Sequence, residues 1–340
     1  DRINNLSVSQ TLAMAAKARE LKAQGKDIIS LSLGEPDFNT PEIIKEAAKR
    51  AIDENWSTFS PLVVYVEIKH FIVTKFIRDN ILNYSPAQIV VSTGAKQSLY
   101  NIAQAMINPG DEVILPAPYW VSYSEIVKMA GGVPIEVPTS VESDFKMTPE
   151  QLAAAVTPKT KMMWFSSPCN PSGSIYSKEE LTALSEILIK NNIYVVSDEI
   201  YEHINFTGNH TSIASIPGMF DLTITVNGVA KAFAMTGYRI GYIGATEVIA
   251  KACTKLQGQV TSGANSVAQR ATITAIETDP KEFGYMTQAF HKRRDLVVGL
   301  LNEIPGFKIN VPEGAFYVFP DVSEFFGKTL NGTLINNADD

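Results

Sequence analysis

Residues 193–201 read Ile-Tyr-Val-Val-Ser-Asp-Glu-Ile-Tyr, a short apolar run that ends in the polar residues Ser197, Asp198 and Glu199. Apolar side chains at consecutive positions predict a strand that is buried on both faces. Similar runs recur along the middle of the chain at residues 88–92, 112–115, 161–165, 222–226 and 240–243. Helix-length segments such as 177–190 separate them. The pattern predicts an α/β fold with a mostly parallel central sheet flanked by helices on both faces.

The two ends of the chain have a different pattern. Residues 11–24 predict a helix that ends at Gly25, and a helical stretch from Lys281 past Arg293 leads to predicted strands at 307–309 and 315–319. We expect residues 46–285 to form a large domain, and residues 1–45 and 286–340 to form a smaller α+β domain built from both chain ends. The polar stretch 336–340 is not typical of the end of a packed domain, so we expect the C-terminal part of the small domain to be incomplete.

Composition limits the possible partners. The chain has 340 residues, of which 45% are hydrophobic and 19% charged, and its net charge of −7 is spread without blocks of like sign. This favours neither nucleic acid nor a membrane surface as a partner. Only two cysteines occur, Cys169 and Cys253, which is typical of a reducing compartment, and we expect a cytoplasmic protein. The four histidines form no metal-ligand spacing, so no metal site is predicted.

Lys231 carries the strongest chemical signal. It lies 33 positions after Asp198 and 8 positions before Arg239. Pyridoxal 5'-phosphate requires an amine that forms a Schiff base, a carboxylate that keeps the pyridine nitrogen protonated, and a cation that meets the phosphate. These three residues are of the required types. Taken singly, however, a strand-end Asp equally fits a turn cap, and an Arg equally fits a surface salt bridge.

Three further residues follow predicted strands and fit the same cofactor. Asn170, in the segment Ser-Pro-Cys-Asn-Pro-Ser-Gly, and the phenol of Tyr201 can both donate hydrogen bonds to the 3' oxygen of a pyridoxal ring. The indole of Trp120 can stack on that ring. The alternatives are ordinary turn chemistry for Asn170 and a core or interface aromatic for Trp120.

A phosphate site is predicted where one strand meets a helix. In Ser-Thr-Gly-Ala-Lys-Gln (92–97), the backbone amides of Gly94, Ala95 and Lys96 stand at the positive end of the predicted helix. The segment lacks the pattern of a Walker loop, and as an isolated strand-turn-helix it equally fits a structural role.

Together these segments resemble the fold type I, class I aminotransferases over nearly the whole chain. The resemblance lies in Gly34 within Ser-Leu-Gly-Glu-Pro-Asp-Phe (32–38), Pro-Tyr-Trp (118–120), Ser-Pro-x-Asn-Pro-Ser-Gly (167–173), Ser-Asp-Glu-Ile-Tyr (197–201) and the run from Lys231 to Arg239. It implies that Lys231 is the catalytic Schiff-base lysine and that Asp198 is the pyridinium partner. It also implies the roles given above for the other cofactor residues. Gly34, Trp120 and Asn170 would bind substrate.

Within the family, the chain looks most like the bacterial aspartate aminotransferases of the shorter subgroup. That resemblance implies amino transfer from aspartate or a similar amino acid to 2-oxoglutarate, with ping-pong kinetics. It further implies a homodimer with shared active sites, in which residues 261–265 contribute to the neighbouring site. The alternatives are a transaminase for aromatic, alanine or prephenate-type substrates, another pyridoxal phosphate enzyme of this fold, and a binding module that has lost catalysis.

Three departures from the family pattern stand out. The family's arginine for the substrate α-carboxylate, near the C-terminus, has no match here. Phe59 and Val64 stand where relatives usually have a tyrosine and a turn glycine, and Phe59 lacks the hydroxyl that reaches the partner's phosphate. Ala230 precedes the lysine where many relatives have serine.

Overall fold

The computed structural model describes residues 4, 6, 7, 10–31, 33–58 and 64–338. Its centre is a seven-stranded sheet with the strand order β1-β7-β6-β5-β4-β2-β3. Strands β6, β5, β4, β2 and β3 are parallel to one another, whereas β7 is antiparallel to both β6 and β1. The strands are β1 (Ile89–Ser92), β2 (Glu112–Ala117), β3 (Val133–Pro138), β4 (Thr160–Ser166), β5 (Tyr194–Asp198), β6 (Thr223–Gly228) and β7 (Gly241–Gly244).

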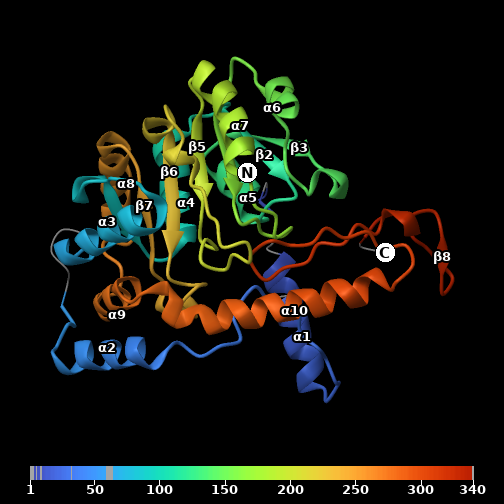
Figure 1. The fold of residues 1–340 in the computed structure, drawn as a ribbon, viewed down its shortest axis with the longest axis horizontal. Coiled ribbons are helices and arrows are strands. Elements are labelled where there is room, and N and C mark those ends of the chain that lie inside the picture. The colour runs from blue at the N-terminus through green and yellow to red at the C-terminus, as the bar shows by residue number, and fades with distance from the viewer. Residues whose placement is uncertain (1–3, 5, 8–9, 32, 59–63, 339–340) are drawn as a thin grey trace.

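Helices cover both faces of this sheet (Figure 1). The side chains of β4 alternate between the faces, as the period of two in a strand requires. Met162 and Trp164 pack in a cluster with helices α4 (Ala95–Met106), α5 (Ser122–Met129) and α8 (Glu247–Val260). Met163 and Phe165 face the other side, where α6 (Pro149–Ala155) and α7 (Lys178–Lys190) pack. A third cluster joins α3 (Val66–Asn80) and α9 (Ser266–Glu277) to the sheet edge. The predicted α/β class is confirmed.

The remaining elements come from the chain ends. They are α1 (Gln10–Ala23), α2 (Glu42–Asp53), the long helix α10 (Gly284–Asn302), and a small hairpin of β8 (Thr329–Leu330) and β9 (Thr333–Leu334). Figure 1 shows α10 below the sheet-containing part of the molecule, with the C-terminal segment returning above it. The proposed domain boundaries stay a prediction.

Some expected elements differ from those observed. Strand β3 was not predicted, because it is an edge strand in which only Val137 is buried. The predicted strands 307–309 and 315–319 are wrong: among the described residues, this region makes only the isolated bridges Asn205 to Gly314 and Lys308 to Asp321. Ala315 has a φ of 58°, which interrupts an extended backbone at the start of the second predicted strand.

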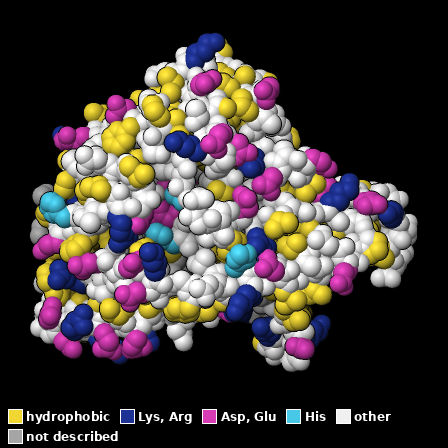
Figure 2. Space-filling view, in the orientation of Figure 1, with side chains coloured by type: hydrophobic (Ala, Val, Ile, Leu, Met, Phe, Trp, Pro, Cys, Tyr) yellow, Lys and Arg dark blue, Asp and Glu magenta, His cyan; other side chains and the backbone are white. Residues whose placement is uncertain are grey.

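The surface is of mixed charge. Figure 2 shows basic and acidic side chains interspersed over the face that it displays, as the even spread of charge along the sequence predicts. No helix in the described part of the chain is both long and apolar enough to cross a membrane. Of the unusual positions near residue 60, Val64 is buried, whereas Phe59 lies outside the described residues.

Candidate active site

The candidate residues follow the carboxyl ends of parallel strands at one edge of the sheet. In the sheet register, Ser166 at the end of β4 lies beside Asp198 at the end of β5, and Asp198 lies beside Val226 of β6. Ligands of open parallel sheets bind at this edge. Trp120 follows β2, Asn170 follows β4, Tyr201 follows β5 and Lys231 follows β6.

Asp198 is a buried carboxylate that lacks the solvation it would have in water. Its Oδ2 accepts a hydrogen bond of 2.8 Å from the Tyr123 hydroxyl, and its Oδ1 accepts one of 3.3 Å from the backbone amide of Ile200. Burial raises the pKa of Asp198 to about 6, although these hydrogen bonds and the charge of Lys231 act in the opposite direction. A carboxylate in this state is stabilised by a cationic group placed against it.

Lys231 is held in a loop between β6 and β7, among aromatic rings. Its Nζ donates a hydrogen bond of 2.5 Å to the Gly34 carbonyl oxygen and lies 5.8 Å from the ring centroid of Tyr201 and 5.6 Å from that of Phe316. Burial lowers the pKa of Lys231 to about 8, opposed by the charges of Glu35 and Asp198. The amine is therefore unprotonated in part of the molecules near neutral pH, which is the form that reacts with carbonyls.

Two tyrosine hydroxyls and an amide meet next to this lysine. The Tyr201 and Tyr317 oxygens lie 2.6 Å apart, and Asn170 Nδ2 donates to the Tyr317 oxygen at 3.5 Å. Gly34 packs directly against the Tyr317 hydroxyl, and a Cβ at this position would overlap it. Asn170, Tyr201 and Gly34 come from segments far apart in the sequence and gather at this point.

A second group lies at the start of α4. Gly94 has a φ of 83°, and a Cβ there would overlap the Arg239 guanidinium. Glycine thus lets the guanidinium approach the first amides of the helix, where the helix dipole favours an anion. Arg239 Nη1 also donates to the Thr236 carbonyl oxygen at 2.9 Å. Thr93 and Arg239 line a cavity of about 660 Å³ that Glu35 and Asn265 also border.

Trp120 and Lys96 contact each other at this end of the site. Lys96 Nζ lies 4.7 Å from the centroid of the Trp120 ring, a cation–π contact. Burial and the charge of Arg239 lower the pKa of Lys96. The structure therefore gives the Lys96 side chain a contact with Trp120, whereas the sequence had suggested only its backbone amide as a binding group.

These groups fit the requirements of pyridoxal phosphate. A buried carboxylate with a raised pKa matches a pyridine nitrogen that takes up a proton, and a lysine with a lowered pKa matches an aldehyde. A helix N-terminus beside a guanidinium matches a phosphate. All three kinds of contact occur at one sheet edge.

Two residues of this site were missed in the sequence. Tyr123 lies on α5, three positions after Trp120, and nothing in its local sequence distinguishes it from a core tyrosine. Tyr317 lies 116 positions after Tyr201, so no local pattern indicates that their hydroxyls meet. Contacts of this kind depend on tertiary packing.

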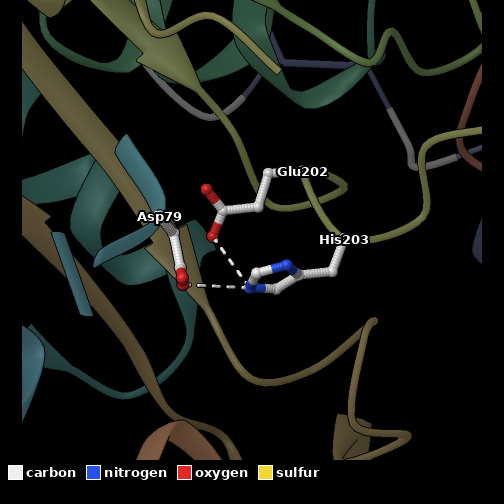
Figure 3. Close-up of side chains that lie close together, drawn as sticks. All are labelled: Asp79, Glu202 and His203. Atoms are coloured by element: carbon white, nitrogen blue, oxygen red, sulfur yellow. Dashed lines mark ion pairs between the residues drawn. The ribbon is translucent and has the colours of Figure 1, made fainter. Parts of the chain in front are cut away.

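A second cluster of ionisable groups lies outside this site (Figure 3). His203 Nε2 is 3.4 Å from both Asp79 Oδ2 and Glu202 Oε1, and the three residues line a cavity of about 1220 Å³. The histidines are thus less isolated than their spacing in the sequence suggests. The buried Lys75 ammonium contacts Glu202 and lies 3.8 Å from Asp79, so a protein cation already neutralises these carboxylates. The absence of a metal site stays a prediction.

Comparison with known proteins agrees with this geometry. A family model described as aminotransferase class I and II matches residues 26–337. The chain is 49% identical to an aspartate/prephenate aminotransferase of Cereibacter sphaeroides, covering 98% of this chain and 84% of the relative. It is 46% identical to an aspartate aminotransferase of Geobacillus stearothermophilus, covering 95% of this chain and 83% of the relative.

Solved structures agree as well. The aspartate aminotransferase from Rhizobium meliloti matches with a TM-score of 0.92 at 42% identity, covering 96% of this chain and 82% of that one. The Thermus thermophilus aspartate aminotransferase with maleate matches with a TM-score of 0.91 at 42% identity, covering 95% of this chain and 85% of that one. The chain therefore belongs to the aminotransferase class I and II family and is a pyridoxal-phosphate-dependent transaminase.

Proposed function

We propose that this protein is an aspartate aminotransferase, which moves the amino group of aspartate or a similar L-amino acid to 2-oxoglutarate. The observation that carries the transaminase chemistry is the buried Asp198 carboxylate at the sheet edge, held by the Tyr123 hydroxyl, together with the Lys231 amine, whose pKa burial lowers. The names of the relatives at 46% and 49% identity support aspartate as the donor.

The chain's own residues account for the chemistry. When bound, pyridoxal phosphate supplies an aldehyde that captures the amino nitrogen and a ring that draws electrons from the reacting carbon. Asp198 supplies the negative charge that keeps a proton on the pyridine nitrogen. Lys231 Nζ, with a pKa of about 8, accepts the α-proton of the substrate and returns it during transfer.

Other residues would bind and orient the cofactor and the substrate. Asn170 and Tyr201 would donate hydrogen bonds to the cofactor's phenolic oxygen, and Trp120 would stack on its ring. Arg239 and the backbone amides of Ala95 and Lys96 would hold the phosphate, whereas the Gly94 amide, which the sequence also suggests, donates to the Ser92 carbonyl oxygen at 2.8 Å. Gly34, Trp120 and Asn170 would bind substrate, and the absence of a side chain on Gly34 makes room for the Tyr317 hydroxyl.

A panel of amino donors tests the proposal. With 2-oxoglutarate as acceptor, product keto acids are followed for aspartate, glutamate, alanine and phenylalanine, and aspartate should give the highest kcat/KM. Lys231→Ala should lose turnover, whereas the matched control Lys255→Ala, an exposed lysine on α8, should keep it. A preparation saturated with cofactor that converts none of the donors would overturn the proposal, and a preference for phenylalanine would overturn the choice of aspartate.

Prephenate is a second candidate acceptor. Relatives named aspartate/prephenate aminotransferase, such as that of Cereibacter sphaeroides, favour it. Ser7 argues weakly against it, because the family resemblance implies lysine at this position in some prephenate-active members. Replacing 2-oxoglutarate by prephenate in the same assay distinguishes the two. Aspartate-dependent consumption of prephenate supports the wider specificity, and its absence excludes it.

A homodimer with shared active sites is part of the same proposal. Large apolar side chains near the N-terminus are exposed in the single chain, including Leu12, Ile29, Leu31, Ile43 and Ile52. Such exposure is typical of a surface that a second subunit covers. Sedimentation velocity should give the mass of two chains; a single-chain mass at micromolar concentration would contradict the proposal.

We also propose a cytoplasmic location. Cys169 and Cys253 are both buried free thiols, which suits a reducing compartment. Localisation of a fluorescent fusion in the native cell tests this.

A further inference from the structure

Tyr317 places a hydroxyl in the candidate site, and the proposed function assigns this hydroxyl no role. Its oxygen lies 2.6 Å from the Tyr201 oxygen and 3.5 Å from Asn170 Nδ2. Asn170 and Tyr201 are the two residues proposed to hold the cofactor's phenolic oxygen. Tyr317 therefore contacts both donors to that oxygen, from a segment more than a hundred residues away.

The number of protons decides the direction of these hydrogen bonds. An amide nitrogen only donates, so the Tyr317 oxygen accepts from Asn170. Two phenols carry two protons, and one of them makes the bond between Tyr201 and Tyr317. Among the residues that the structure describes, neither hydroxyl has another hydrogen-bond partner, so the second proton is left without a protein acceptor.

Both phenols keep their protons at neutral pH. Burial raises the pKa of Tyr317 to about 12 and that of Tyr201 well above its usual value. If Tyr201 donated to Tyr317, the proton of Tyr317 would be the one without an acceptor. If Tyr317 donates to Tyr201, the remaining proton is on Tyr201, where the proposed function needs a donor.

We propose that Tyr317 is a positioning residue. It donates a hydrogen bond to the Tyr201 oxygen and so leaves the Tyr201 hydroxyl proton directed toward the phenolic oxygen of the cofactor. The hydrogen bonds form a chain in which Asn170 donates to Tyr317 and Tyr317 donates to Tyr201. Hydrogen bonds in such a chain polarise one another, so each strengthens the next. This inference rests on the proposed function, because it concerns how the same site binds its cofactor.

The consequence is a change in the ionisation of the bound cofactor. Hydrogen bonds to the phenolic oxygen stabilise its anionic form and thereby lower the pH at which the lysine-bound cofactor loses its proton. Without the Tyr317 hydroxyl, Tyr201 is a weaker and less well oriented donor. The titration should then shift to higher pH.

The test is a pH titration of the visible absorbance of the holoprotein. In Tyr317→Phe the midpoint should rise by about half a pH unit, in the direction of the larger rise in Tyr201→Phe. Because Tyr317 acts through Tyr201, the double variant should match Tyr201→Phe alone. Tyr194→Phe, which removes a hydroxyl at the opposite end of β5, serves as the control and should leave the midpoint unchanged.

A nearly isosteric replacement guards against a folding defect. Site-specific 3,5-difluorotyrosine at position 317 keeps the shape of the ring but makes the phenol a stronger donor, so the midpoint should fall. An unmoved midpoint in both Tyr317 variants would overturn the inference, as would shifts that add in the double variant. Tighter cofactor binding by Tyr317→Phe would also overturn it, because Tyr317 would then compete with the cofactor.

The visible band of the wild-type protein distinguishes failure of the proposed function from failure of the inference about Tyr317. If the site does not bind pyridoxal phosphate through Lys231, the wild-type protein has no visible band to titrate after the cofactor is added. If only the inference about Tyr317 fails, the wild-type band is present and titrates.

Discussion

Burial of the Asp198 carboxylate destabilises the protein when no cofactor is bound. The pKa of Asp198 is about 6 in the folded protein, above the usual 3.8, so the folded state binds this proton more tightly than the unfolded state. The contribution of Asp198 to stability is therefore fully present below pH 3.8 and is lost as the pH rises through 6. At neutral pH the ionised group opposes folding.

Asp198→Asn should accordingly stabilise the cofactor-free protein while weakening cofactor binding. We expect the free energy of unfolding to rise by about 1 to 3 kcal/mol at pH 7.5, because a neutral amide replaces a buried charge. At pH 4 wild type and variant should differ little. Urea unfolding of the cofactor-free proteins measures this, with the exposed Asp221→Asn as control. A variant that is less stable than wild type at pH 7.5 would contradict the ionisation assigned to Asp198.

Individual residues differ in how far the sequence reveals them. Asp198 and Lys231 could be predicted because Asp198 ends one recognisable apolar strand and Lys231 follows the next, and strand ends meet at one edge of a parallel sheet. Tyr123 and Tyr317 could not, because they reach the site through packing of segments 75 and 116 positions away from Asp198 and Tyr201. Their side chains carry no local pattern that distinguishes them from core tyrosines.

The N-terminus of α4 depends on Gly94 for both its backbone and its approach to Arg239. A left-handed φ of 83° disfavours any side chain, and a Cβ would overlap the guanidinium. Gly94→Ala should destabilise the protein by about 1 to 3 kcal/mol and weaken pyridoxal phosphate binding more than it weakens binding of pyridoxal, which lacks the phosphate.

Gly258→Ala on α8 is the matched control. A Cβ there has nothing within 4 Å and the residue lies inside a helix, so alanine should be neutral or stabilise by up to about 1 kcal/mol. Fluorescence titration with the two ligands gives the affinities. An equal loss of affinity for both ligands in Gly94→Ala would show that the phosphate does not bind at this end of α4.

Strands that are buried and well paired could be predicted from the sequence, whereas exposed or poorly paired segments could not. Strands β4, β5 and β6 are nearly or fully buried and form apolar runs in the sequence, whereas β3 has a single buried residue, Val137, and so gives no such run. The region 315–319 looks like a strand in composition, but the pairing with residues 204–206 ends at the left-handed Ala315 and amounts to one isolated bridge. Burial and pairing partners, rather than local propensity, decide these cases.

The ion network around Glu202 links distant parts of the whole molecule. Glu202 receives a hydrogen bond of 2.7 Å from Asn80 on α3 and one of 2.8 Å from Asn227 on β6, and it contacts the buried Lys75. Burial raises the pKa of Glu202, but the charges of Lys75, His203 and His210 outweigh this effect and hold it at about 2. Its contribution to stability is therefore present above pH 4.5 and is lost as the pH falls toward 2.

Glu202→Gln should lower the free energy of unfolding by about 3 kcal/mol at pH 7, because Lys75 loses its closest counter-charge. At pH 3.5 the difference from wild type should be smaller. Denaturant unfolding at the two pH values measures it, with the exposed Glu303→Gln as control. A loss that is the same at both pH values would show that Glu202 acts through packing rather than charge.

Both chain ends contribute to a site that the central sheet positions. Gly34 from the N-terminal segment accepts the hydrogen bond of Lys231, and Tyr317 from the C-terminal segment contacts Tyr201, both next to residues that follow β5 and β6. Cofactor binding should therefore be sensitive to how these segments pack on the sheet.

The central claim is that Lys231 is the amine that binds the cofactor. Reduction of the holoprotein with sodium borohydride fixes the cofactor to its lysine, and peptide mass spectrometry then identifies the labelled residue. We predict the pyridoxyl label on Lys231 alone, with the label absent from Lys231→Ala and present in Lys255→Ala. A label on another lysine with Lys231 unmodified, or a protein that takes up no label, would contradict the account.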